Sequence, residues 1–201
     1  MWWRTDMSRH SALKSSARLM LTAVMAALLG GCGFQLRGAP PVSSALEPLA
    51  VDCSSQVPDT LCRSLREQLD LGNVRVAPVA EADYILRLKN FERDRRASAI
   101  TAQAAAAEYT LRHSVDLEVI SADRIPMVGT TRLTTSESYR YDETNVLARQ
   151  REEETLRQQM DDRLAQQVIF RLAPLTPQRI DAIRADYQRE QEADAPATGQ
   201  P

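Results

Sequence analysis

The stretch of residues 108–120 constrains the fold more than any other part of the chain. Its apolar side chains alternate with polar ones along the whole stretch. Successive side chains of a β-strand point to opposite faces, so one face of this strand packs on a core and the other meets water. A second amphipathic layer is therefore needed to cover the apolar face. The apolar positions are Tyr109, Leu111, His113, Val115, Leu117 and Val119.

The flanking segments predict the rest of this sheet and the helices that cover it. The expected order is a strand, a helix, a short strand, three long strands and a helix. This order indicates an α+β fold, with two amphipathic helices packed on one face of a mostly antiparallel four-stranded sheet. The expected strands are 46–52, 74–78, 83–93, 108–120 and 127–141, and the expected helices lie between residues 58 and 72 and at 145–172.

Two segments have too little apolar periodicity for a packed element. Residues 97–107 are nearly all small and are interpreted as a mobile hairpin tip. The chain becomes polar near its C-terminus, which predicts a disordered tail over residues 185–201. We therefore expect one α+β domain over residues 46–184.

The N-terminal 31 residues have the three regions of a bacterial secretory signal. A basic start, at Met1 or Met7, is followed by an apolar run and then by Leu-Gly-Gly before Cys32. The run is too short for a membrane span, which needs about 20 apolar residues. The small residues predict cleavage before Cys32 and acylation of its thiol, with no other cofactor. An ordinary signal peptide with a chance cysteine is the alternative.

The segment after the anchor is expected to be a tether over residues 32–45, rich in Gly and Pro. Gly33 follows the cysteine, where an aspartate would favour retention in the inner membrane. We therefore expect the outer membrane, on its periplasmic side. That compartment is oxidising, so Cys53 and Cys62 are expected to form a disulfide, with two buried thiols as the alternative.

A search for chemistry identifies no catalytic, phosphate-binding or metal-binding motif. His113 is the single histidine outside the signal and is interpreted as a core residue. The run Glu152-Glu153-Glu154 is interpreted as a solvated helix face. A net charge of −2 argues against a nucleic-acid partner. The sequence thus favours a protein that is not an enzyme.

Basic residues on the expected strands form the main candidate for a binding surface. Their guanidinium and ammonium groups are suited to anionic phosphates. From charge alone, a solubilising surface with interleaved acids is the simpler interpretation, and an anion-binding face is the alternative. The candidates are Arg87, Lys89, Arg95, Arg96 and Arg112.

Three sets of residues resemble the lipopolysaccharide-assembly lipoprotein family, LptE. The first is Cys32-Gly33-Phe34-Gln35-Leu36-Arg37-Gly38, which resembles the start of the mature family members. The second is Ala107-Glu108-Tyr109 at the start of a strand. The third is Leu147-Ala148-Arg149 before the last helix, with Met160, Arg163, Ala165, Gln167 and Leu172 along it.

This resemblance implies a role without catalysis. Members of the family plug the lumen of the outer-membrane β-barrel LptD, assist its folding, and bind lipopolysaccharide during insertion into the outer leaflet. A basic residue before the last helix is expected at the lipid-binding end, and Arg149 matches it. The hairpin tip has no charge, so Arg95 or Arg96 would have to serve there. An auxiliary lipoprotein of another lipid transporter, or a secretin pilotin, is the competing hypothesis.

Overall fold

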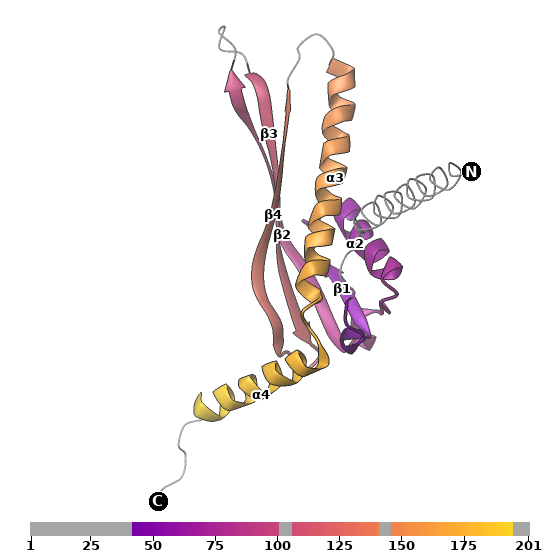
Figure 1. Cartoon of the computed structure of the whole chain (residues 1–201), viewed down its shortest axis with the longest axis vertical. Coiled ribbons are helices and arrows are strands. Elements are labelled where there is room, and N and C mark those ends of the chain that lie inside the picture. The colour runs from indigo at the N-terminus through magenta and orange to yellow at the C-terminus, as the bar shows by residue number, and fades with distance from the viewer. Residues whose placement is uncertain (1–41, 101–105, 141–145, 195–201) are drawn as a thin grey trace, which may run out of the picture. The chain divides into compact units, whose positions relative to one another are not determined.

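The computed structural model describes residues 42–100, 106–140 and 146–194. Its single sheet has the strand order β1-β2-β3-β4 (Figure 1). The first pair is parallel and the other two pairs are antiparallel, which confirms the predicted α+β class with a mostly antiparallel sheet. The strands are β1 (Leu49–Cys53), β2 (Tyr84–Ile100), β3 (Ala106–Ser121) and β4 (Pro126–Arg140).

Two helices cover one face of this sheet, as the amphipathic patterns predict (Figure 1). Helix α2 (Asp59–Leu71) connects β1 to its parallel neighbour β2, because parallel neighbours need a crossover connection. Helix α3 (Val146–Leu172) runs along the strands. Two short 3-10 turns, η1 (Ser44–Leu46) and η2 (Val79–Glu81), complete the connections.

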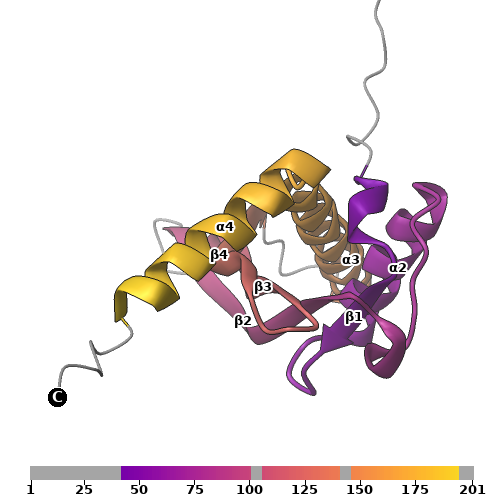
Figure 2. The same ribbon diagram turned by 90° about the horizontal axis from the view of Figure 1, so that it is seen from below.

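A third helix, α4 (Pro177–Asp194), lies across the end of the sheet next to β3 and β4 (Figure 2). The disordered tail expected from residue 185 was therefore wrong up to Asp194. The backbone N–H of Arg179 donates to Oγ1 of Thr176 at 3.3 Å, and proline occupies the first helical position. Three apolar residues at helical spacing dock α4 on the core: Ile180, Ile183 and Tyr187.

The short strand expected at 74–78 was also wrong. This segment makes one isolated parallel bridge, between Leu49 and Val76. Pro78, two residues after Val76, has no N–H to extend the ladder, and η2 begins at the next residue. The strands on either side of the expected hairpin tip are longer than predicted, and residues 101–105 lie outside the described part of the chain.

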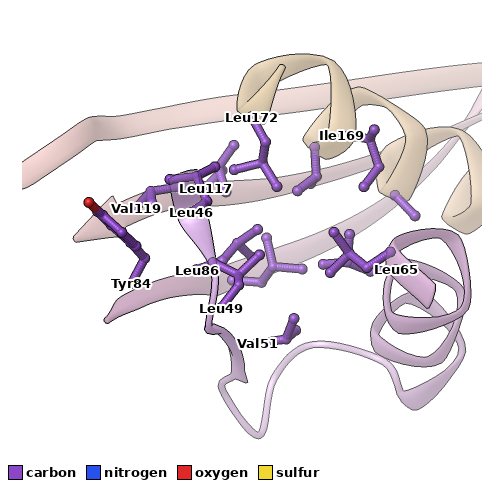
Figure 3. Close-up of a cluster of buried hydrophobic side chains, with 14 of the residues drawn as sticks. Leu46, Leu49, Val51, Leu65, Tyr84, Leu86, Leu117, Val119, Ile169 and Leu172 are labelled. Atoms are coloured by element: carbon purple, nitrogen blue, oxygen red, sulfur yellow. The ribbon is translucent and has the colours of Figure 1, made fainter. Parts of the chain in front are cut away.

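The main core lies between α2, α3 and the strands near β1. Figure 3 shows Ile169 and Leu172 of α3 pointing toward Leu117, with Leu65 of α2 on the opposite side of the cluster. Burying one leucine contributes about 1.5–3 kcal/mol, so this cluster is the main source of stability. Its fully buried members include Leu46, Leu49, Leu61, Leu65, Leu69, Leu86, Leu117, Leu164, Val168 and Leu172.

A disulfide joins the end of β1 to the first turns of α2. It links Cys53 to Cys62 across a Cα–Cα distance of 6.6 Å. The linked residues lie nine positions apart in the sequence. The bridge therefore restrains the connection that leads from the sheet edge into the helix.

The other edge of the sheet is formed by β4, which has 15 residues. Gln167 of α3 reaches this strand, and its Nε2 donates to the carbonyl oxygen of Thr134 at 3.2 Å. One backbone acceptor of the edge strand is therefore occupied by a side chain of the covering helix.

The expected signal peptide, the acylation site Cys32 and residues 32–41 of the tether lie outside the described residues. Within the described ranges, the structure contains no helix both long enough and apolar enough to cross a membrane.

Candidate functional site

A β-bulge in β2 divides the candidate cations between the two faces of the sheet. Between Lys89 and Glu92, β2 has one residue more than the facing segment of β3. Asn90 takes the left-handed conformation there, with φ 52°, and its Nδ2 donates to Oδ2 of Asp116 at 2.9 Å. The extra residue exchanges the faces of the side chains that follow, as far as the next register shift after Ala97. We call the half of the sheet nearer β1 the proximal half, and the half beyond the bulge the distal half.

The consequence is that Arg95 does not lie with Arg87 and Lys89. Regular alternation would place all three on one face, because their numbers are odd. In the structure, Arg87 and Lys89 lie on the outer face, away from α3, whereas Arg95 lies on the inner face, against α3. Arg96 takes the outer face instead.

The proximal cations of the outer face are neutralised by carboxylates. Nζ of Lys89 donates to Glu118 at 2.5 Å, and Arg87 lies 3.5 Å from the same carboxylate and 3.4 Å from Asp52. The hydrogen bond from Lys89, followed by that from Thr130, lowers the pKa of Glu118. These cations therefore solubilise the sheet and stabilise its register, in agreement with the simpler interpretation of their charge.

The distal part of the outer face is hollowed. A cavity of about 460 Å³ opens between β2, β3 and β4. Two of its arginines are paired, Arg96 with Asp94 at 2.5 Å and Arg132 with Glu92. Arg112 lies between them on the central strand, and its side chain makes no ion pair or hydrogen bond within the part of the chain that the structure describes.

On the inner face of the distal half, Arg95 is held between aromatic rings and a carboxylate. Its guanidinium carbon lies 3.8 Å from the centre of the Tyr109 ring and 6.0 Å from that of Tyr139. Its Nε lies 3.9 Å from Oε2 of Glu153, to which the Tyr139 hydroxyl donates at 2.7 Å. Burial, and then this hydrogen bond, raises the pKa of Tyr139 to about 12.

Glu153 was assigned to a solvated helix face, but only 14% of its side chain is exposed. The sequence could not predict this burial, because its neighbours are also acidic. A run of charged residues has no apolar periodicity that would indicate which one faces the core. Arg149 lies four residues earlier on α3 and so shares this helix face. Its Nε and one terminal nitrogen are buried. Arg95 and Arg149 thus belong to one inner-face group at the distal end.

A second buried polar group connects α2, α3 and β3. Nδ1 of His113 lies 3.0 Å from Oδ1 of Asp161, and the Thr60 hydroxyl donates to Oδ2 of Asp161 at 2.5 Å. Arg93 approaches the same carboxylate to 4.0 Å. His113 and Asp161 are both almost fully buried. This arrangement pairs Nδ1 of His113 and both carboxylate oxygens of Asp161 inside the protein, in agreement with the interpretation of His113 as a core residue.

The predicted site residues therefore fall into three places. Arg87, Lys89, Arg96 and Arg112 lie on the outer face, and Arg95 and Arg149 on the inner face. Cys32 lies outside the described residues. Those residues contain no cluster of side chains that could hold a metal ion. The arrangement offers charged hydrogen-bond donors to a ligand.

Comparison with known proteins identifies the fold and the family. The structure is similar to a minor lipoprotein from Acinetobacter baumannii, with a TM-score of 0.53 and 23% identity, over 63% of this chain and 90% of the other. It is also similar to the rare lipoprotein B from Shewanella oneidensis, with a TM-score of 0.52 and 23% identity, over 70% and 98% of the two chains. At this identity, these likenesses establish the fold.

The sequence comparisons are more specific. The LPS-assembly lipoprotein LptE from Yersinia enterocolitica is 32% identical over 77% of this chain and 74% of its own length. The protein of the same name from Photorhabdus laumondii is 29% identical over 76% of this chain and 83% of its own length. The family model for LptE, described as lipopolysaccharide-assembly, matches residues 46–172, from η1 to the end of α3. The chain therefore belongs to the LptE family of lipoproteins that take part in lipopolysaccharide assembly.

Proposed function

We propose that this lipoprotein plugs and supports assembly of the LptD β-barrel, and binds lipopolysaccharide during its insertion into the outer leaflet. Acyl chains on Cys32 hold it to the periplasmic side of the outer membrane. Three acyl chains make release negligible, because each buried methylene contributes about 0.8 kcal/mol. Membership of the LptE family supports this proposal.

The observation that carries the plug proposal is the length and polarity of the outer face. Strands β2, β3 and β4 have 17, 16 and 15 residues. At about 3.3 Å per residue, a strand of this length spans roughly 50 Å, more than the ~30 Å hydrocarbon core of a bilayer. Most charges on this face are already paired, so it can lie against the polar lumen of a barrel without leaving buried charges unpaired.

The lipid-binding proposal rests on cations at the distal half. Lipopolysaccharide is rich in phosphate, which arginine binds through two parallel hydrogen bonds. Arg149 lies in the first turn of α3 at this end, and Arg112 projects from the outer face. Arg87, Lys89, Arg95 and Arg96 are engaged by carboxylates or rings and make a smaller contribution.

Co-purification tests the barrel proposal. The tagged full-length protein is purified from detergent-solubilised outer membranes, and its partners are identified by mass spectrometry. We expect one large β-barrel protein in stoichiometric amount. Recovery of the protein alone, or with inner-membrane transporter subunits, would contradict the proposal and favour an auxiliary lipoprotein of another system.

Charge reversal at Arg149 tests the lipid-binding proposal. We expect Arg149→Glu to weaken lipopolysaccharide binding about tenfold, because a hydrogen bond to a charged group contributes about 1.5–3 kcal/mol. Arg151→Glu is the matched control, since its exposed side chain lies on another face of the same helix turn. Direct binding to immobilised lipopolysaccharide measures both, and circular dichroism verifies folding. Equal affinity of the two variants would remove Arg149 from the site.

A further inference from the structure

The hollow on the distal outer face combines three kinds of side chain in one place. Its four arginines come from three adjacent strands: Arg93 and Arg96 from β2, Arg112 from β3 and Arg132 from β4. The Arg93 guanidinium is directed to Asp161, which it approaches to 4.0 Å. The carboxylates of Glu92 and Asp94 line the same cavity. Hydroxyl groups come from Ser114 and Thr134.

The internal contacts fix most of these groups in position. Arg132 donates through Nη2 to Oγ of Ser114 at 2.9 Å, and its Nη1 lies 3.3 Å from Asp116. Arg96 is paired with Asp94. The hollow is therefore preorganised around Arg112, whose guanidinium retains its full donor capacity toward a ligand.

The register places Arg112 at the centre of this arrangement. It lies opposite Asp94 on β2 and opposite Ser136 on β4, while Ser114 lies opposite Glu92 and Thr134. A ligand phosphate on Arg112 would thus have acceptor carboxylates on one side and hydroxyls on the other. No residue from the inner face is needed to complete the site.

This combination selects against a simple polyanion. Two carboxylates beside one open guanidinium repel a second and third phosphate group. They accept hydrogen bonds from hydroxyl groups of a ligand, and the serine and threonine hydroxyls can both donate and accept. The chemistry fits one phosphate group carried on a polyhydroxylated skeleton.

We propose that the hollow around Arg112 binds a phosphorylated sugar of the lipopolysaccharide headgroup. The phosphate pairs with Arg112, and the sugar hydroxyls donate to Glu92 and Asp94. This inference rests on the proposed function and adds a saccharide site on the outer face. It is separate from the inner-face group that contains Arg95 and Arg149.

Titration followed by NMR tests the site directly. The mature full chain, in detergent and labelled with nitrogen-15, is titrated with glucose 1-phosphate, glucose and inorganic phosphate. We expect glucose 1-phosphate to shift amide signals of residues 92–96, 112–114 and 132–134. It should bind at least several-fold more tightly than inorganic phosphate or glucose, because each of these offers only half of the contacts.

Variants assign the effect to the guanidinium. Arg112→Gln is expected to weaken glucose 1-phosphate binding about tenfold, because it removes a charge-assisted pair. Arg112→Lys keeps the positive charge but loses the planar pair of N–H donors, and it should bind with intermediate affinity. Arg63→Gln on α2 removes the same charge far from the hollow and should bind as the wild type does.

Three results would overturn the proposal. The first is the absence of shifts in the hollow, and the second is equal binding by the wild type and Arg112→Gln. The third is failure of added lipopolysaccharide to displace glucose 1-phosphate, which would leave a soluble sugar phosphate as the ligand. Co-purification of the barrel with the wild-type protein distinguishes failure of this site from failure of the plug proposal. A bound barrel without sugar binding refutes this site alone, whereas sugar binding without a barrel refutes the plug proposal alone.

Discussion

The proximal and distal halves of the sheet are held to α3 by different forces. In the proximal half, a continuous set of leucine and valine side chains from both helices covers the strands. In the distal half, the apolar cluster among the described residues has Leu111, Tyr139 and Met160 as its buried members. There, oriented contacts of Arg95 and Glu153 supplement it. Apolar packing is non-directional, so it tolerates small shifts of the helix on the sheet. Hydrogen bonds and stacked rings require a defined orientation of the side chains that form them.

This difference indicates that the two halves of the sheet have different roles. The proximal half supplies the stability of the domain, and the distal half positions the groups proposed to contact lipid. Four changes to the protein test this comparison, in order of decreasing expected effect.

Deletion of Asn90 should have the largest effect. It removes the extra residue of the bulge and would turn Arg95 outward and Arg96 against α3, which destroys the inner-face group. We expect a loss of several kcal/mol in the free energy of unfolding, measured by urea denaturation. The control is Asn90→Gly, which keeps the residue count and readily adopts positive φ. A deletion variant as stable as this control would show that the bulge does not set the two faces.

Truncation of one leucine in each half compares the two clusters. We expect Leu117→Ala to cost about 4 kcal/mol and Leu111→Ala about 2 kcal/mol, because the smaller cluster can relax around the cavity. Both side chains are almost completely buried in the native state. Urea denaturation measures both values. Equal costs would show that the two halves are equally well packed.

Removal of the disulfide tests the proximal half alone. Replacing Cys53 and Cys62 by alanine should lower the free energy of unfolding by about 2–3 kcal/mol, because the closed loop is short. The NMR signals of the Tyr109 and Tyr139 rings should remain unchanged in the native state. A changed aromatic signal would reveal coupling between the halves that the comparison does not predict.

The smallest expected effect is at Glu118. Its pKa is lowered in the folded state, so its contribution is present above the ordinary value of 4.5 and is lost as the pH falls through the folded pKa. Glu118→Gln should therefore flatten the loss of stability below pH 4.5. At neutral pH it should cost less than about 1 kcal/mol. Glu67→Gln on α2 is the control and should follow the wild-type pH dependence.

The sequence predicts the elements that have strong local signals. Helix α2 is expected between residues 58 and 72 because Pro58 and Gly72 bracket a leucine repeat, and the structure places it at Asp59–Leu71. Long alternating strands are equally clear. Helix α4 was missed because its exposed surface is almost entirely polar, although Thr176-Pro177 and three spaced apolar residues mark it.

The site was less predictable because it depends on pairing between distant segments. A bulge is defined by the strand opposite, and alternation within β2 alone would place Arg95 on the wrong face. The partner of His113 is 48 residues away on α3, and nothing near either residue reveals the pairing. The role of a side chain that acts through long-range contacts can therefore be predicted only once the fold is known.

The hydrogen bond from Gln167 to β4 also affects the tendency of the protein to self-associate before it binds a partner. A 15-residue edge strand is a template on which a strand of another chain can add, and this is a common route to aggregation. Gln167 occupies one acceptor of that template, and Pro126 at its start has no N–H to offer. These two features make self-association through the open edge less favourable while the edge remains exposed to water.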